Sequence, residues 1–199
     1  FEKCIKMNVS QYWQQAHAMH ALGRELELIK WEKYPKAAPT RMTTYFRLAV
    51  KAMLKDDKEE ARKWIEEIEA IAVTGSSPHF SVFAIPSFVR HMGIEGYDPE
   101  ACRAAYNELA EKVKGKWNNN RYNYVRYISG DIDEADYRRD VAVQDERVAH
   151  KNGIRAELRG EPAVALAIYE AGLAEAGQYD DFKIFLEWRI KALKRQINE

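Results

Sequence analysis

Gly160-Glu-Pro-Ala-Val-Ala-Leu-Ala-Ile-Tyr-Glu-Ala-Gly-Leu-Ala-Glu-Ala176 is the stretch that decides the fold, because it joins a turn residue to an apolar helical pattern. After Gly160, a small residue comes five positions on at Ala165, an aromatic residue nine on at Tyr169, and a small residue twelve on at Gly172. Small residues let two helices that share a tight turn pack closely, and the large residue fills the space between them. The stretch therefore predicts the second helix of a helical hairpin.

The same spacing occurs around the turn at Asp56. Ala61 lies five positions after it and Ile65 nine positions after it. Upstream of this turn, large and small residues stand at helical spacing: Tyr45, Leu48, Ala49 and Ala52. The segment therefore predicts a complete hairpin.

Two further turns repeat the pattern only in part. Ala101 lies five positions after Gly96, and Ala135 lies five positions after Gly130. The ninth positions are Ala105, which is small, and Arg139, which is charged. These segments are therefore degenerate versions of the same unit.

The combined pattern resembles the tetratricopeptide repeat, whose signature includes Ala-x3-Phe after a helix–turn–helix corner. The resemblance covers roughly residues 40–176, and the closing Pro of that family is absent from all of the units. It implies an all-α fold, a right-handed superhelix of antiparallel helix pairs that binds a peptide or partner helix in its concave groove. An irregular α-helical bundle remains the alternative fold.

We expect one domain over residues 1–199, with an N-terminal capping helix and linker in 1–39, about four helix pairs in 40–176 and a C-terminal capping helix in 177–199. Apolar spacing over residues 8–33 predicts a single long amphipathic helix at the start. A helix over residues 79–92 is expected to be interrupted or to start late at Pro86. Asn152-Gly153 predicts a kink or break before Ile154.

If the repeat spacing holds, the first helix of each pair lines the concave face. Tyr and Trp give large contact area at small entropic cost, and Arg can bind a carboxylate through two parallel hydrogen bonds. The resemblance therefore implies a protein–protein interaction module, although packing of these aromatics in the core is an equal alternative. The expected partner-binding residues are Phe46, Val50, Met53, Arg90, Trp117, Asn120, Arg121, Tyr124, Tyr127 and His150.

Two other functions stay open. An all-helical enzyme or small-ligand-binding protein would place a closed pocket around His79, Arg90 and His91, although the sequence carries no recognised catalytic motif. Single-stranded nucleic acid would suit the basic and aromatic residues of segment 112–127. The equal numbers of basic and acidic residues, 31 and 31, argue against this third possibility.

We expect no cofactor, no metal and no membrane span. His17 and His20 are three apart but lack an associated Glu or Cys pattern, and Asp131, Asp133 and Asp136 lack the closing Glu of a calcium loop. No apolar run approaches the roughly 18 to 20 residues that a bilayer requires. Cys4 and Cys102 are either two idle thiols or one disulfide. Nothing in the sequence assigns an oligomeric state or a compartment.

Overall fold

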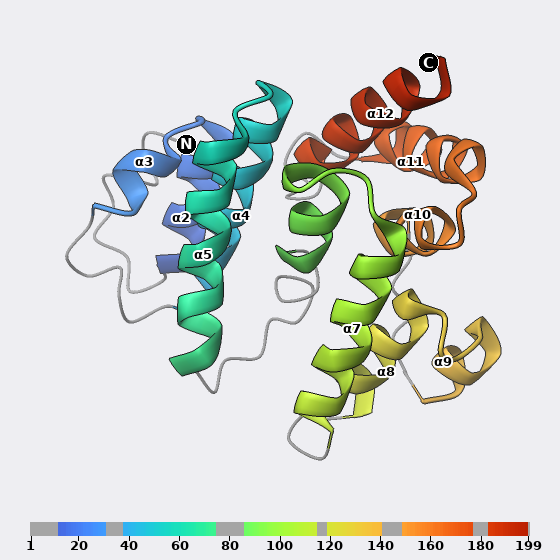
Figure 1. Cartoon of the computed structure of the whole chain (residues 1–199). Coiled ribbons are helices and arrows are strands. Elements are labelled where there is room, and N and C mark those ends of the chain that lie inside the picture. The colour runs from blue at the N-terminus through green and yellow to red at the C-terminus, as the bar shows by residue number, and fades with distance from the viewer. Residues whose placement is uncertain are drawn as a thin grey trace.

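The computed structural model describes residues 12–30, 38–74, 86–114, 119–140, 149–176 and 183–198. The fold is all-α, as predicted, and no strand occurs in these ranges. A helical turn at 86–89 runs directly into the π-helix η2. The helices, in chain order (Figure 1), are α2 (Tyr12–Ala21), α3 (Glu25–Leu28), α4 (Ala38–Leu54), α5 (Lys58–Thr74), η2 (Arg90–Ile94), α7 (Pro99–Val113), α8 (Asn119–Ser129), α9 (Glu134–Asp140), α10 (Ala149–Leu158), α11 (Pro162–Glu175) and α12 (Lys183–Asn198).

Two hairpins, α4–α5 and α10–α11, have matching turns. Asp56 and Gly160 both adopt a left-handed backbone conformation, with φ of 61° and 76°. The following amides, of Asp57 and Glu161, donate to the carbonyls of Ala52 and Ala156 at 2.9 Å and 3.0 Å. Two segments far apart in the sequence therefore make the same corner. When the two hairpins are aligned with Ala61 on Ala165, residues at the same aligned position are called counterparts.

The corner alanines test the predicted spacing. Ala61 and Ala165 are fully buried, each with 0% of its surface exposed. Ala101 is only half-buried, and Ala135 is exposed. Ala135 lies on α9, which the structure describes over Glu134–Asp140. The close corner packing therefore occurs at two of the four alanines.

Gly153 lies inside α10, which runs without a break, so the predicted kink at Asn152-Gly153 is wrong. A Cβ atom at Gly153 would lie 2.0 Å from Cε1 of Tyr169, far inside contact distance. Glycine in the middle of a helix costs about 0.5–1 kcal/mol relative to alanine. Its presence here is explained by the approach of α11, whose Tyr169 ring occupies the space of the missing side chain.

The N-terminal helical pattern is divided, which corrects the prediction of one helix over residues 8–33. Gly23, with φ of 70°, separates α2 from α3. Beyond the turn, the buried carboxylate of Glu25 accepts from Nζ of Lys51 at 2.5 Å and from Nε of Arg47 at 3.2 Å. Burial alone raises the pKa of Glu25, but the hydrogen bond from Lys51 and the charges of Lys51 and Arg47 outweigh it and lower the pKa. The ion pairs hold α3 against α4.

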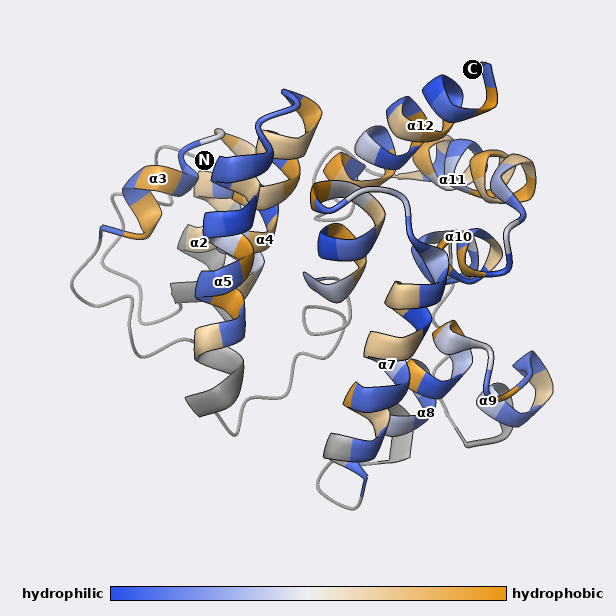
Figure 2. Ribbon diagram, in the orientation of Figure 1, coloured by the Kyte–Doolittle hydropathy of each residue, from blue (hydrophilic) through white to orange (hydrophobic). Residues whose placement is uncertain are grey.

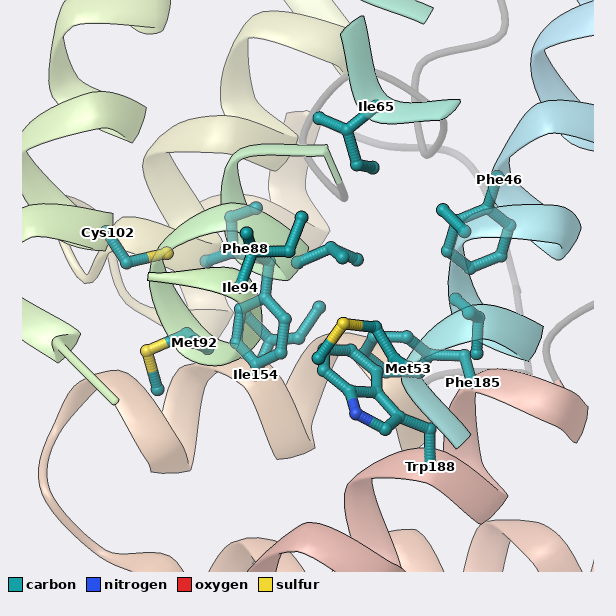
Figure 3. Close-up of a cluster of buried hydrophobic side chains, with 14 of the residues drawn as sticks. Phe46, Met53, Ile65, Phe88, Met92, Ile94, Cys102, Ile154, Phe185 and Trp188 are labelled. Atoms are coloured by element: carbon teal, nitrogen blue, oxygen red, sulfur yellow. The ribbon is translucent and has the colours of Figure 1, made fainter. Parts of the chain in front are cut away.

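The C-terminal helix α12 packs against both α11 and α4 and so joins the last hairpin to the first. The Phe185 ring centroid lies 6.2 Å from that of Phe46, 5.7 Å from that of Phe88 and 5.9 Å from that of Tyr169. Figure 3 shows this meeting of side chains from different elements. The core is therefore centred on α12, which is more than a cap at one end of a stack.

Candidate functional site

Most of the predicted groove residues lie inside the protein. Phe46, Val50, Met53, Tyr124, Tyr127 and His150 are buried. Trp117 lies outside the described residues. Asn120 and Arg121 lie on α8, but their side chains are not among those described. The side chains that are described, apart from Arg90, therefore do not line an open surface in this structure.

The predicted groove residues on α4 are covered because α12 lies against this helix. Phe46 packs beside Phe185, and Met53 and Trp188 both approach Gly93, where a Cβ atom would lie 3.0 Å and 2.7 Å from their nearest atoms. This contact joins segments that are far apart in the sequence, so helical spacing within α4 does not reveal it. These side chains fill the core. Core packing was the alternative to lining a groove that the sequence left open for them.

Tyr127 on α8 is covered by α9 and α10. Its ring stacks on Tyr137 at a centroid distance of 4.7 Å, and its hydroxyl donates to Oδ1 of Asn152 at 2.9 Å. The guanidinium of Arg155 lies 4.3 Å from the ring centroid and donates to the carbonyls of Tyr127 and Ile132. Tyr127 therefore connects three helices within the fold.

Among the predicted site residues whose side chains are described, Arg90 remains partly exposed. Its Nη2 donates to Oε2 of Glu69 on α5 at 2.8 Å, and its Nη1 lies 3.5 Å from Oε1 of Glu95. His91 Nδ1 lies 3.1 Å from the other oxygen of Glu95. Arg90 and His91 therefore meet at one carboxylate, while His79 lies outside the described residues. Arg90 already holds two carboxylates.

A buried charged cluster that the sequence analysis missed joins α10, α11, α12 and η2. Arg189 and Glu157, with 1% and 0% of their side chains exposed, form a two-point ion pair in which Nε donates to Oε1 at 2.9 Å. The Tyr169 hydroxyl donates to the same carboxylate at 2.9 Å, and Nη1 of Arg189 donates to the Met92 carbonyl at 3.1 Å. All of the partners are internal, so the cluster positions four elements relative to one another.

Cys102 and two tyrosines lie in the interior near that cluster. Burial, together with the negative charge of Glu157, raises the pKa of the Cys102 thiol. Burial also raises the pKa values of Tyr106 and Tyr169 well above the ordinary range. The thiol is therefore protonated at neutral pH, a state in which a cysteine is a poor nucleophile.

The two hairpins differ on the outer faces of their second helices. On α5 the exposed positions are mainly charged: Glu59, Lys63, Glu66, Glu67 and Ala70. Their counterparts on α11 are mainly apolar: Ala163, Ala167, Glu170, Ala171 and Ala174. Val164, next to this row, has 49% of its surface exposed. Figure 2 shows α5 largely in blue and α11 largely in orange and tan.

The apolar surface of Ala163, Val164, Ala167, Ala171 and Ala174 is here called the α11 outer face. Acidic residues border it: exposed Glu161 precedes the helix, exposed Glu175 ends it, and Glu170 pairs with Lys194 at 2.7 Å. Between Pro162 and Glu175 the helix has no Lys or Arg. The sequence did contain a signal for this face, namely an apolar helix without an obvious polar side.

Other kinds of site receive no support from the residues that the structure describes. Within them, no group of three or more His, Cys, Asp or Glu side chains is placed to hold a metal ion. None of the described helices is long and apolar enough to cross a membrane. Searches with the whole chain found no matching family model, no matching curated protein and no matching solved structure.

Proposed function

We propose that this chain is a protein–protein interaction module that docks a helix of a partner protein on the α11 outer face. The observation that carries the proposal is the exposure of an apolar helix surface. A helix that is apolar on all sides is normally buried on all sides. In α11 the side with Ala165 and Tyr169 is buried, whereas the side with Val164 and Ala167 is exposed. A partner would cover the second side.

The α5 helix supplies the contrast. It occupies the corresponding place in the other hairpin, and Lys63 and Glu67 stand where α11 has Ala167 and Ala171. Charged residues are what a solvated helix face ordinarily carries. The same scaffold therefore carries a charged face in one hairpin and an apolar face in the other, which supports a specific role for the apolar one.

We further propose that the fold is an irregular helical bundle built around two tetratricopeptide-like hairpins. In an open repeat superhelix, each unit contacts only its sequence neighbours. Here α12 packs on α4, and Nζ of Lys191 donates to the Leu54 carbonyl at 2.6 Å. This closure fills the inner side with residues such as Phe46 and Val50, so the outer faces are the surfaces that remain for partners.

A matched pair of double variants tests the docking face. Ala167→Gln with Ala174→Gln places bulky polar groups on the α11 outer face, and Lys63→Gln with Ala70→Gln makes the same change at the exposed counterparts on α5. Burying an amide without a hydrogen-bond partner costs about 1–3 kcal/mol. We expect proteins that co-precipitate with the wild-type chain to be reduced at least about tenfold by the α11 variant.

The α5 variant should retain those proteins, because Lys63 and Ala70 lie outside the proposed face. Both variants should unfold within about 0.5 kcal/mol of the wild type in urea, because they change exposed positions. Equal retention by the two variants, or equal loss, would mean that the α11 outer face is not the docking surface.

A further inference from the structure

We infer that the helix received by the α11 outer face is a basic amphipathic helix, with large apolar residues along its seam and Lys or Arg at its flanks. This inference rests on the proposed function, and it adds the shape and the charge of the partner. Two independent features of the face carry it: the short side chains of its seam and the acidic residues of its border.

The shape of the face requires large side chains from the partner. Ala163, Ala167, Ala171 and Ala174 form one row at helical spacing, and Val164 is the exposed residue of α11 that has a larger apolar side chain. Helices that meet through alanine approach to the short end of the usual axial distance of about 8–10 Å. Residues such as Leu on the partner would fit between the alanines, as large and small residues alternate across packed helices.

The border charges select against a second copy of this chain as the occupant. Glu161 and Glu175 stand at opposite ends of α11, so a second copy of this helix would bring like charges together in either orientation. A helix with Lys or Arg near both ends would instead gain attraction at Glu161 and Glu175.

The size of the α11 outer face limits the affinity expected for a partner helix. A helix of 14 residues is about 21 Å long, and a contact through one such face falls below the ~1,200 Å² that separates weak interfaces from standard ones. The association should therefore be weak and partly electrostatic, and salt should reduce it because the border charges are exposed.

Synthetic helices of about 18 residues with one leucine seam and with Lys, Glu or Gln flanks test this inference against the full chain. Fluorescence anisotropy should show the Lys-flanked peptide binding at least about tenfold more tightly than the Glu-flanked one at low salt. The difference should shrink as salt is added. Glu161→Lys with Glu175→Lys should reverse the order of the two peptides, because it reverses the border charges.

The outcomes separate this inference from the proposed function. Equal binding of the Lys-flanked and Glu-flanked peptides overturns the charge inference, and loss of both with Ala167→Gln and Ala174→Gln would still support the docking face. Dimerisation of the wild-type chain that this variant abolishes would make the occupant a second copy. Absence of binding by every peptide at about 1 mM overturns the inferred partner, while co-precipitation still decides the proposed function.

Discussion

The α4–α5 and α10–α11 hairpins are alike at their corner and different on their outer surface. Ala61 and Ala165 are fully buried beside turns with the same backbone conformation. The outer face of α5 is charged, whereas that of α11 is apolar. The buried corner is what two helices need in order to pack closely, so it reports the fold. The outer face is not needed for that packing, so its composition reports the surroundings of each hairpin.

The first helices of the two hairpins also use the same positions for different neighbours. Arg47 and Lys51 on α4 hold the buried carboxylate of Glu25. Their counterparts on α10, Lys151 and Arg155, lie over the rings of Tyr124 and Tyr127, at 5.4 Å and 4.3 Å from the centroids. A pair of cations one helical turn apart can therefore fix a carboxylate in one hairpin and aromatic rings in the other. The scaffold is repeated and its contacts are not.

The largest predicted effect concerns the fully buried ion pair between Glu157 of the second hairpin and Arg189 of α12. Glu157 is the counterpart of Met53 in the first hairpin. Arg189→Met would leave the Glu157 carboxylate buried without its cation. Breaking a buried pair from one side costs about 3–5 kcal/mol. Urea denaturation should show this loss, and the double variant with Glu157→Met should recover most of it. A single variant that loses under 1 kcal/mol would mean that the pair is not needed for packing.

The next effect concerns Glu25, which fixes the N-terminal helices to the first hairpin only. Glu25→Gln should remove about 1.5–3 kcal/mol of charge-assisted hydrogen bonding at neutral pH. Because the pKa of Glu25 is lowered in the folded protein, this contribution is complete above the ordinary value of 4.5 and is lost as the pH falls through the folded pKa.

Amide hydrogen exchange of α2 and α3, measured from pH 7 downward, gives the readout for Glu25. The variant and the wild type should differ near neutrality and converge in acid, with Glu27→Gln on the exposed side of α3 as the control. A difference that does not depend on pH would show that the Glu25 carboxylate charge is not what holds α3 against α4.

The corner packing of the second hairpin is tested by Gly153→Ala. The added methyl group would overlap the Tyr169 ring, and overpacking of this kind typically costs about 1–3 kcal/mol. At the counterpart position, Ala49→Gly should cost about 1–2 kcal/mol, from the entropy of glycine in a helix and the loss of a fully buried methyl group. Thermal unfolding of the two variants compares them directly. A stabilising Gly153→Ala would show that α11 does not approach α10 so closely.

The smallest effects are expected at the turn residues. Gly160→Ala should cost about 1–2 kcal/mol, because a side chain is disfavoured at its φ of 76°. Asp56→Gly should change stability by less than about 1 kcal/mol, because relief of the left-handed conformation offsets loss of the exposed ion pair with Arg195. Differential scanning calorimetry resolves the two, and equal losses would contradict the matched turn geometry.

The sequence revealed the local part of this fold well. Turn residue, small residue and large residue at fixed spacing identified the corners at Ala61 and Ala165, because hairpin packing depends on neighbours in the chain. It did not reveal that Gly23 divides the first helix or that Gly153 does not break α10. The break at Gly23 is a local turn, in which the Arg24 amide donates to the Met19 carbonyl at 2.9 Å. At Gly153 a tertiary partner, the Tyr169 ring, decides the outcome.

The candidate site was harder to predict from the sequence, because it depends on which helix faces are covered by other helices. Helical spacing placed Phe46 and Val50 on one face of α4, but only the packing of α12 against α4 shows that this face is internal. The Glu157–Arg189 pair joins separate helices, and no local pattern identifies such a pair. The apolar composition of α11 was visible in the sequence, but the exposure of Val164 and Ala167 was not.

One photo-cross-linking measurement tests the central claim most directly. A benzophenone amino acid is placed at Ala171 on the α11 outer face or at its exposed counterpart Glu67 on α5, and the full chains are irradiated in lysate of the source cells. The proposal predicts partner adducts from position 171, mapped by mass spectrometry to a helical segment with Lys or Arg flanks, and none above background from position 67. Adducts of equal yield from both positions, or from position 67 alone, would contradict it.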